Sequence, residues 1–203
     1  MNKTYIHNYV TVKSNIINYN GENIFSSDCS DDVGSFLKKV YREFGIKYPK
    51  YFKMDRLSKL GFIASEILFK EENLENHNPS DYGLIFANSS SSLDTDYKFQ
   101  ESLSSIASPS VFVYTLANIV TGEIAIRRDF KGEICFFIQE KPDFNFLSNY
   151  CKQVLLTTKT KNIVLAWVEL DPNGKYCAYM ADVSNSQSEL ELSEKELQRI
   201  FKV

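Results

Sequence analysis

Short apolar stretches of strand length, separated by helical patterns, constrain the fold of this chain more than any other feature. Tyr82–Asn88 (YGLIFAN) and Ile134–Ile138 are continuous apolar runs, typical of strands buried on both faces. Apolar residues recur at helical spacing between such runs, for example after Asp55. Alternation of buried strands with amphipathic helices predicts an α/β fold, with a mixed sheet covered by helices.

Turn and capping signals add local detail. Asn20-Gly21, between β-forming flanks, predicts a hairpin after the strand Tyr5–Lys13. The sequence Asp-Pro-Asn-Gly at 171–174 predicts a second hairpin, which joins strands at 163–170 and 175–183. Ser193 and Glu196 form a capping box that opens a short last helix. Further helices are expected over about 33–44, 55–69, 93–106, 114–128 and 144–157.

Length and charge limit the classes of function. The 203 residues contain no evident linker, so we expect a single domain over residues 1–203. A formal net charge of −3 with dispersed basic residues offers no basic face for nucleic acid. No apolar run approaches the roughly 18 residues of a membrane span, and the N-terminus has no apolar signal region. We therefore expect no nucleic-acid partner, no membrane span and a cytoplasmic protein.

Three segments, taken in order, resemble a known family. They are KMDRLSKLGFIASEILF at 53–69, DYGLIFANSSSSLDTD at 81–96, and the stretch 108–144 with its Asn118, Gly122 and Lys131-Gly132 turn. Together they resemble the N-terminal half of a β-ketoacyl synthase (3-oxoacyl-ACP synthase) of the thiolase-like fold. The resemblance implies a truncated, single ketosynthase lobe with a family-like core over 1–170. A divergent hairpin and short helix would follow over 171–203.

The resemblance also implies where a nucleophile should stand. In such synthases a cysteine lies at the start of the helix after the strand that follows the glycine turn, where the helix dipole favours the thiolate. Counting from Gly132 places this position near Glu140, Lys141 and Pro142, and none of these is a conventional nucleophile. The two catalytic histidines of the family's second half have no counterpart here. We therefore expect no catalytic residue.

The cysteines and histidines that are present favour structural roles. Cys29, Cys135, Cys151 and Cys177 are widely spaced without a CxxC pair, which suggests neither a zinc site nor a disulfide framework. His7 and His77 have no recognisable partner in the sequence. We expect no metal and no cofactor.

Two candidate sites follow from the resemblance. An acyl pocket, if retained, is expected around Phe112, Tyr114, Asn118 and Phe137. The strand 163–170 is the expected dimer strand, with Ile163, Leu165 and Trp167 as its apolar residues. An apolar strand at a sheet edge must be covered, either by a partner or by the C-terminal hairpin and helix. Trp167 fits an ordinary core position equally well.

The preferred functional hypothesis is a non-catalytic accessory subunit of bacterial fatty-acid or polyene/polyketide-type biosynthesis. It would act by association, as a homodimer, as a heterodimer with a ketosynthase, or with an acyl carrier protein. One alternative is an acyltransferase or condensing-type enzyme that uses a non-standard cysteine, and another is a purely structural dimer without an acyl ligand. Fold analogy alone does not decide among these functions.

Overall fold

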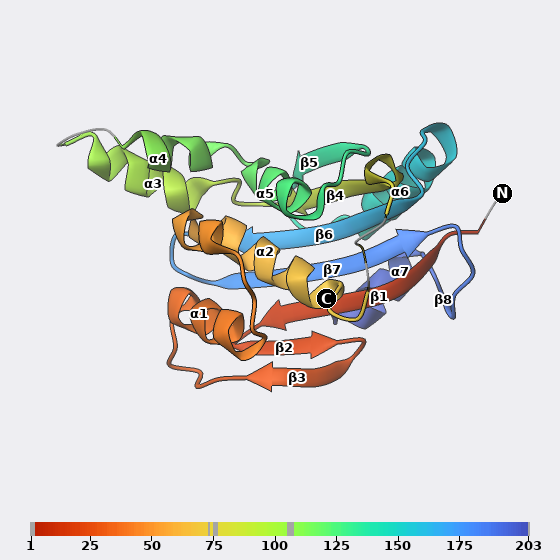
Figure 1. Cartoon of the computed structure of the whole chain (residues 1–203), viewed down its shortest axis with the longest axis horizontal. Helices are drawn as coiled ribbons and strands as arrows, with labels where there is room; N and C mark the ends of the chain where they lie inside the picture. The colour runs from red at the N-terminus through yellow and green to blue at the C-terminus, as the bar shows by residue number, and fades with distance from the viewer. Residues whose placement is uncertain (1–2, 73, 75–76, 105–107, 203) are drawn as a thin grey trace.

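A mixed β-sheet forms the centre of the computed structural model, which describes residues 3–72, 74, 77–104 and 108–202 (Figure 1). Its strands are β1 (Tyr5–Lys13), β2 (Ile16–Tyr19), β3 (Glu22–Ser26), β4 (Tyr82–Asn88), β5 (Ile134–Ile138), β6 (Asn162–Leu170), β7 (Tyr176–Ser184) and β8 (Leu190–Glu191). The order across the sheet is β3-β2-β1-β7-β6-β4-β5, and β8 pairs with β1. The β4–β5 and β4–β6 pairings are parallel and the others antiparallel. The expected α/β class with a mixed sheet is confirmed.

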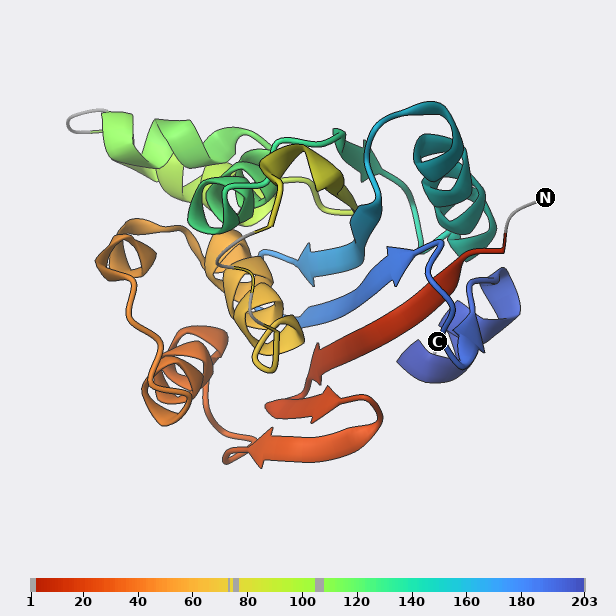
Figure 2. The ribbon, with the colours of Figure 1, turned by 45° about the vertical axis from the view of Figure 1, so that its right-hand side comes forward.

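Helices cover both faces of this sheet and produce three layers (Figure 2). Helices α1 (Val33–Glu43), α2 (Arg56–Leu68) and α5 (Ile119–Arg128) pack on one face, and α6 (Phe144–Thr157) and α7 (Glu194–Phe201) on the other. The shorter segments are α3 (Leu93–Ser102), α4 (Pro109–Phe112) and the 3-10 turns η1 (Pro49–Lys53), η2 (Pro79–Asp81) and η3 (Val113–Thr115). Within the described ranges no single helix is long and apolar enough to cross a membrane. The segments Pro109–Thr115 and Ile119–Arg128 meet that test only when joined across a 99° bend.

The turn and capping residues act as the sequence indicated. Asn20 and Gly21 adopt positive φ angles of 51° and 88°, as the two-residue hairpin between β2 and β3 requires. The Asp55 carboxylate accepts a hydrogen bond from Ser58 N at 2.9 Å, and Ser193 Oγ accepts one from Glu196 N at 3.1 Å. Each cap satisfies an N–H group that the first helical turn leaves free, so α2 and α7 begin where expected.

The helix expected over 114–128 is divided. Leu116 is extended, with φ −91° and ψ 121°, and α5 begins only at Ile119. The Ser92 hydroxyl donates a hydrogen bond to the Thr115 carbonyl at 2.7 Å, so the loop after β4 binds a carbonyl that a continuous helix would use. The helix expected over 93–106 ends at Ser102, and residues 105–107 lie outside the described residues.

The expected edge position of strand 163–170 is corrected by the structure. β6 lies between β4 and β7 and is paired along both edges. Ile163, Leu165 and Trp167 are only 0%, 2% and 4% exposed, and they pack in the core beneath α6 and α7. They are therefore core residues, and no strand of a partner can add to β6 without displacing β4 or β7. Strand β7, which belongs to the segment 171–203 that was expected to diverge, covers one edge of β6.

Strand β5 forms the edge instead. It pairs with β4, and within the described residues no other strand lies beyond it. Ile134 and Ile138 are 40% and 60% exposed, so the expectation of a fully buried strand is wrong for β5. Its apolar composition alone did not reveal this, because a core strand and an uncovered edge strand can carry the same residues.

A close approach between two backbones explains the glycine of the Lys131-Gly132 turn. Gly132 N donates to the Tyr82 carbonyl oxygen at 2.8 Å. A Cβ atom on Gly132 would stand 2.5 Å from that same oxygen, closer than real side chains approach. The glycine therefore lets the chain enter β5 directly alongside β4.

One carboxyl group is buried within the sheet. Asp182 of β7 is 4% exposed, and its Oδ1 has no hydrogen-bond partner within the described residues. Burial, with a smaller contribution from the negative charge of Glu72, raises the pKa of Asp182 to about 7. Below about pH 7 the neutral acid is therefore the predominant form in the folded protein.

We expect Asp182 to make the protein less stable as pH rises. The unfolded side chain has a pKa of about 3.9, so between about pH 4 and 7 the folded state retains a proton that the unfolded state has lost. The free energy of unfolding then decreases with pH across this window. Asp182→Asn should remove the decrease and be more stable than the wild type at pH 8 by a few kcal/mol. Urea denaturation of both proteins at pH 5 and pH 8 measures this effect. If the free energy of unfolding changes between pH 5 and pH 8 by the same amount in the variant as in the wild type, the prediction is contradicted.

Candidate functional site

The junction between β5 and α6 is where the family resemblance placed a nucleophile. Gln139 N–H still donates to a carbonyl of β4, at 2.9 Å, and the chain then leaves the sheet. Glu140 and Lys141 are exposed, Pro142 is half-buried, and α6 begins at Phe144. No thiol, hydroxyl or imidazole stands between the strand and the helix.

The N-terminus of α6 is already occupied by a carboxylate. Asp143 caps the helix, and its Oδ1 accepts a hydrogen bond from Phe146 N at 2.8 Å. A helix N-terminus can favour a thiolate through its free N–H groups and its dipole. Here the carboxylate of Asp143 takes that place and stabilises the start of α6.

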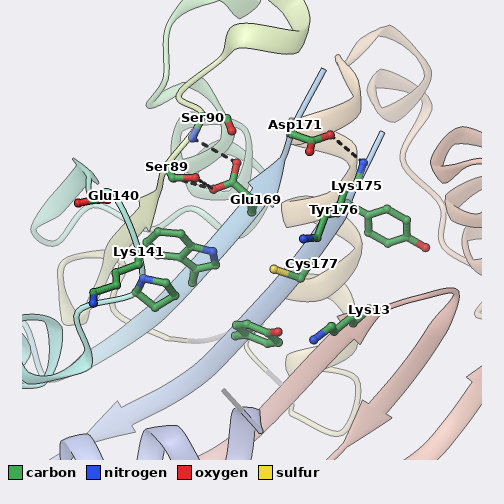
Figure 3. Close-up of a pocket in the computed structure, with 13 residues that line it drawn as sticks. Lys13, Ser89, Ser90, Glu140, Lys141, Glu169, Asp171, Lys175, Tyr176 and Cys177 are labelled. Atoms are coloured by element: carbon green, nitrogen blue, oxygen red, sulfur yellow. Dashed lines mark hydrogen bonds between the residues drawn. The ribbon is translucent and has the colours of Figure 1, made fainter. Parts of the chain in front are cut away.

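A cavity of about 370 Å³ opens beside this junction (Figure 3). Its walls include Trp167 and Glu169 of β6, Cys177 and Tyr179 of β7, and residues 140–142. Figure 3 shows Lys13 and Lys141 on opposite sides of the cavity. No histidine lines it, so the cavity holds no pairing of a thiol with an imidazole base.

Glu169 fixes the serine loop after β4. Its carboxylate accepts hydrogen bonds from the N–H and hydroxyl of Ser89, both at 2.6 Å, and from Ser90 N at 3.2 Å. These N–H groups are therefore engaged by an internal anion and do not form a phosphate cradle. Sequence reasoning missed Glu169, although a single glutamate within the apolar run IVLAWVEL was a usable signal.

Three of the four cysteines are poorly suited to nucleophilic chemistry. Cys151 is fully buried in α6, and burial raises the pKa of its thiol far above the ordinary value. Burial also raises the pKa of Cys177 to about 11, and it raises the pKa of Cys135, whose sulfur lies 3.2 Å from the Tyr150 hydroxyl. Cys29 is exposed, in the loop between β3 and α1. At neutral pH the three thiols with raised pKa values are protonated, which disfavours attack on an acyl group.

The histidines lie away from the cavity. His7 Nε2 is 2.7 Å from Ser184 Oγ, and burial lowers the pKa of His7. His77 packs edge-on against the rings of Tyr82 and Phe130. Ser184 is itself only 2% exposed, so its contact with His7 gives no accessible nucleophile.

The structure does not gather the four candidate acyl-pocket residues around one cavity. Phe112 is 57% exposed, and Asn118 is exposed at the start of α5. Tyr114 is buried, and its hydroxyl donates to Glu123 Oε1 at 2.9 Å. Phe137 packs against aromatic rings of α6 on the opposite face of the sheet. The cavity beside Glu140–Pro142 involves other residues.

Metal ligands are not clustered. Within the part of the chain that the structure describes, no group of three or more His, Cys, Asp or Glu side chains could hold a metal ion. Of the three acidic residues that line the cavity, Glu169 and Asp171 accept hydrogen bonds from main-chain N–H groups nearby, and Glu140 is exposed.

Solved structures share this fold, although no family model and no curated protein matches the sequence. The structure described as the ishigamide ketosynthase/chain length factor aligns with a TM-score of 0.64 at 16% identity, over 93% of this chain and 64% of that chain. The AntDE:AntF complex, a type II polyketide synthase acyl-carrier protein with its ketosynthase, aligns with a TM-score of 0.61 at 13% identity. This match covers 92% of this chain and 64% of that chain.

A third match is of nearly equal length. It is a chain from the ketosynthase ApeO in complex with its chain length factor ApeC, from Xenorhabdus doucetiae. It aligns with a TM-score of 0.59 at 11% identity, over 98% of this chain and 90% of that chain. The resemblance to β-ketoacyl synthases is thus confirmed at the level of the fold, and this chain spans less than two thirds of the ishigamide and AntDE:AntF chains.

We expect the Asp143 cap to be needed for the stability of α6. Asp143→Ala should lower the free energy of unfolding by about 1 kcal/mol, because Phe146 N loses its acceptor. Asp143→Asn keeps an acceptor oxygen and should lower the free energy of unfolding by only a few tenths of a kcal/mol. Urea denaturation of the three proteins gives the comparison, and equal losses in both variants would show that the cap is not responsible.

Proposed function

We propose that this protein is a non-catalytic partner subunit of a ketosynthase, in a bacterial fatty-acid or polyene/polyketide-type pathway. The observation that carries this proposal is the β5–α6 junction. The chain keeps the strand and helix between which a ketosynthase presents its cysteine, but it places Glu140, Lys141 and Pro142 there. Asp143 then occupies the helix N-terminus. A subunit of this kind would act by association.

The solved structures of the same fold support association. Those structures are of ketosynthases with chain length factors or with an acyl-carrier protein. The alignment over 98% of this chain and 90% of a chain in the ApeO–ApeC structure also indicates that a chain of this extent can take part in such a complex. We therefore favour a heterodimer with a ketosynthase over a homodimer.

The edge of β5 offers a way to associate. The Glu133 carbonyl and the Gln139 N–H both bond to β4. Main-chain groups alternate in direction along a strand, so those of Ile134, Phe136 and Ile138 point to the open edge. A partner strand can pair with these groups and cover the exposed side chains of Ile134 and Ile138.

We expect no covalent acyl-protein to form. When the purified protein is incubated with an acyl-carrier-protein thioester, intact-mass spectrometry should show an unchanged mass, because no activated thiol is present. A catalytic ketosynthase in a parallel reaction serves as the control. An acyl adduct that maps to Cys135, Cys177 or Cys151 would contradict the non-catalytic function and favour an acyltransferase.

We expect lysines at the β5 edge to prevent association. With a co-expressed ketosynthase of the same genome, the wild type should sediment as a heterodimer. Ile134→Lys/Ile138→Lys should sediment separately, because the lysines place charge on the contact surface. Ile16→Lys is the matched control, since Ile16 is a strand residue with a similar exposure of 37% on β2, away from this edge. This mode of assembly is contradicted if the wild type binds no ketosynthase of the genome, or if the double variant still associates with one.

A further inference from the structure

Exposed apolar side chains concentrate on one part of the surface. Thirteen large hydrophobic residues of the described chain are exposed, and six of these lie between residues 93 and 116. They are Leu93, Tyr97, Leu103, Phe112, Val113 and Leu116, with exposed fractions from 39% to 57%. We call the helical segments that carry them, residues 93–104 and 108–116, the arm. Single exposed hydrophobic residues are ordinary, but a cluster of this size indicates a contact surface.

The arm projects from the body of the protein. α3 and α4 lie side by side at one end of the molecule, beyond the sheet, in both views (Figures 1 and 2). The rings of Phe99 and Phe112 pack across the two segments, with centroids 5.2 Å apart. Both views also place the arm on the side of the molecule that carries β5, the open edge of the sheet. One partner can therefore reach the β5 edge and the arm together.

The base of the arm is held rigidly. Asp94, at the start of α3, is 5% exposed and accepts hydrogen bonds from Arg56 and from Lys98 at 2.8 Å. The Thr95 hydroxyl donates to Asp55 Oδ2 at 2.8 Å, so the carboxylate that caps α2 also anchors α3. The hydroxyl of Ser92, the residue just before the first segment, donates a hydrogen bond to Thr115 O in the second segment. The apolar surface is therefore presented in a fixed position, which lowers the entropic cost of binding.

The second segment of the arm, residues 108–116, carries no charged residue. Residues 102–122 contain no Asp, Glu, Lys or Arg, although charged residues make up 24% of the chain. A surface that remained in water would be expected to carry such residues, and the core of a protein interface is depleted of them. A membrane-binding surface would be expected to carry basic residues beside the apolar ones. Residues 102–122 have none, and Lys98 of the first segment is paired with Asp94. A protein partner is thus favoured over a lipid surface.

We infer that the arm docks on the ketosynthase subunit that pairs with β5, as the second half of one continuous interface. This inference rests on the proposed function and adds to it the surface that supplies most of the apolar contact. Phe112 and Leu116 are expected to be its principal anchors, because both are 57% exposed and both lie in the charge-free stretch.

The test compares two substitutions in the arm with one at an equally exposed residue outside it. Phe112→Ser and Leu116→Ser, in the full chain, should each weaken binding to the ketosynthase by about tenfold or more, as expected for anchors of an interface. Phe52→Ser is the control, because Phe52 is also 57% exposed but lies on η1, outside the arm. Binding is measured by titration calorimetry, and thermal unfolding confirms that each variant folds.

The outcomes separate the two proposals. If the wild type binds a ketosynthase and the arm variants bind it equally well, the arm inference is overturned while the proposed function stands. If the wild type binds no ketosynthase of its genome, both are overturned. If the wild type instead binds vesicles of phosphatidylcholine and phosphatidylglycerol, and the arm variants do not, the arm is a lipid-binding surface and the inference is overturned.

Discussion

The pairing of β6 along both of its edges is the constraint on which the rest of the structure depends. It joins the parallel β4–β5 unit to the antiparallel strands β7 and β1, in a register that runs from Asn162 opposite Ser184 to Leu170 opposite Tyr176. Because β6 is paired along both edges, it offers no free edge to a partner strand. The open edge of the sheet is instead at β5, the last strand in the sheet order. The candidate site lies where this strand ends, at the β5–α6 junction.

Local elements could be predicted from the sequence because their signals are local. Asn20-Gly21, Asp55 and Ser193 each determine a turn or helix start through atoms a few residues away. The order of strands in the sheet depends on non-local pairing, and the apolar runs of β5 and β6 do not reveal their neighbours. The break near Leu116 likewise depends on a hydrogen bond to Thr115 from Ser92, which is 23 residues away.

The position of the candidate site was predictable, and the residues that form it were less so. Counting from Gly132 was sufficient to locate the junction, because Gly132 is held in place by the close approach of β4. The roles of Asp143 and Glu169 emerged only from the structure, since an acidic residue that accepts main-chain N–H groups looks like any other in a sequence. Phe112, Tyr114 and Phe137 share an apolar character but not a location, because Phe137 packs on the face of the sheet opposite to Tyr114 and Phe112 is exposed.

The open edge of β5 also bears on how such a subunit persists in a cell. An uncovered apolar strand edge invites non-specific pairing with other chains, and unassembled copies are exposed to aggregation and proteolysis. For the proposed subunit, the steady amount in the cell should then follow the supply of the ketosynthase more closely than the subunit's own rate of synthesis.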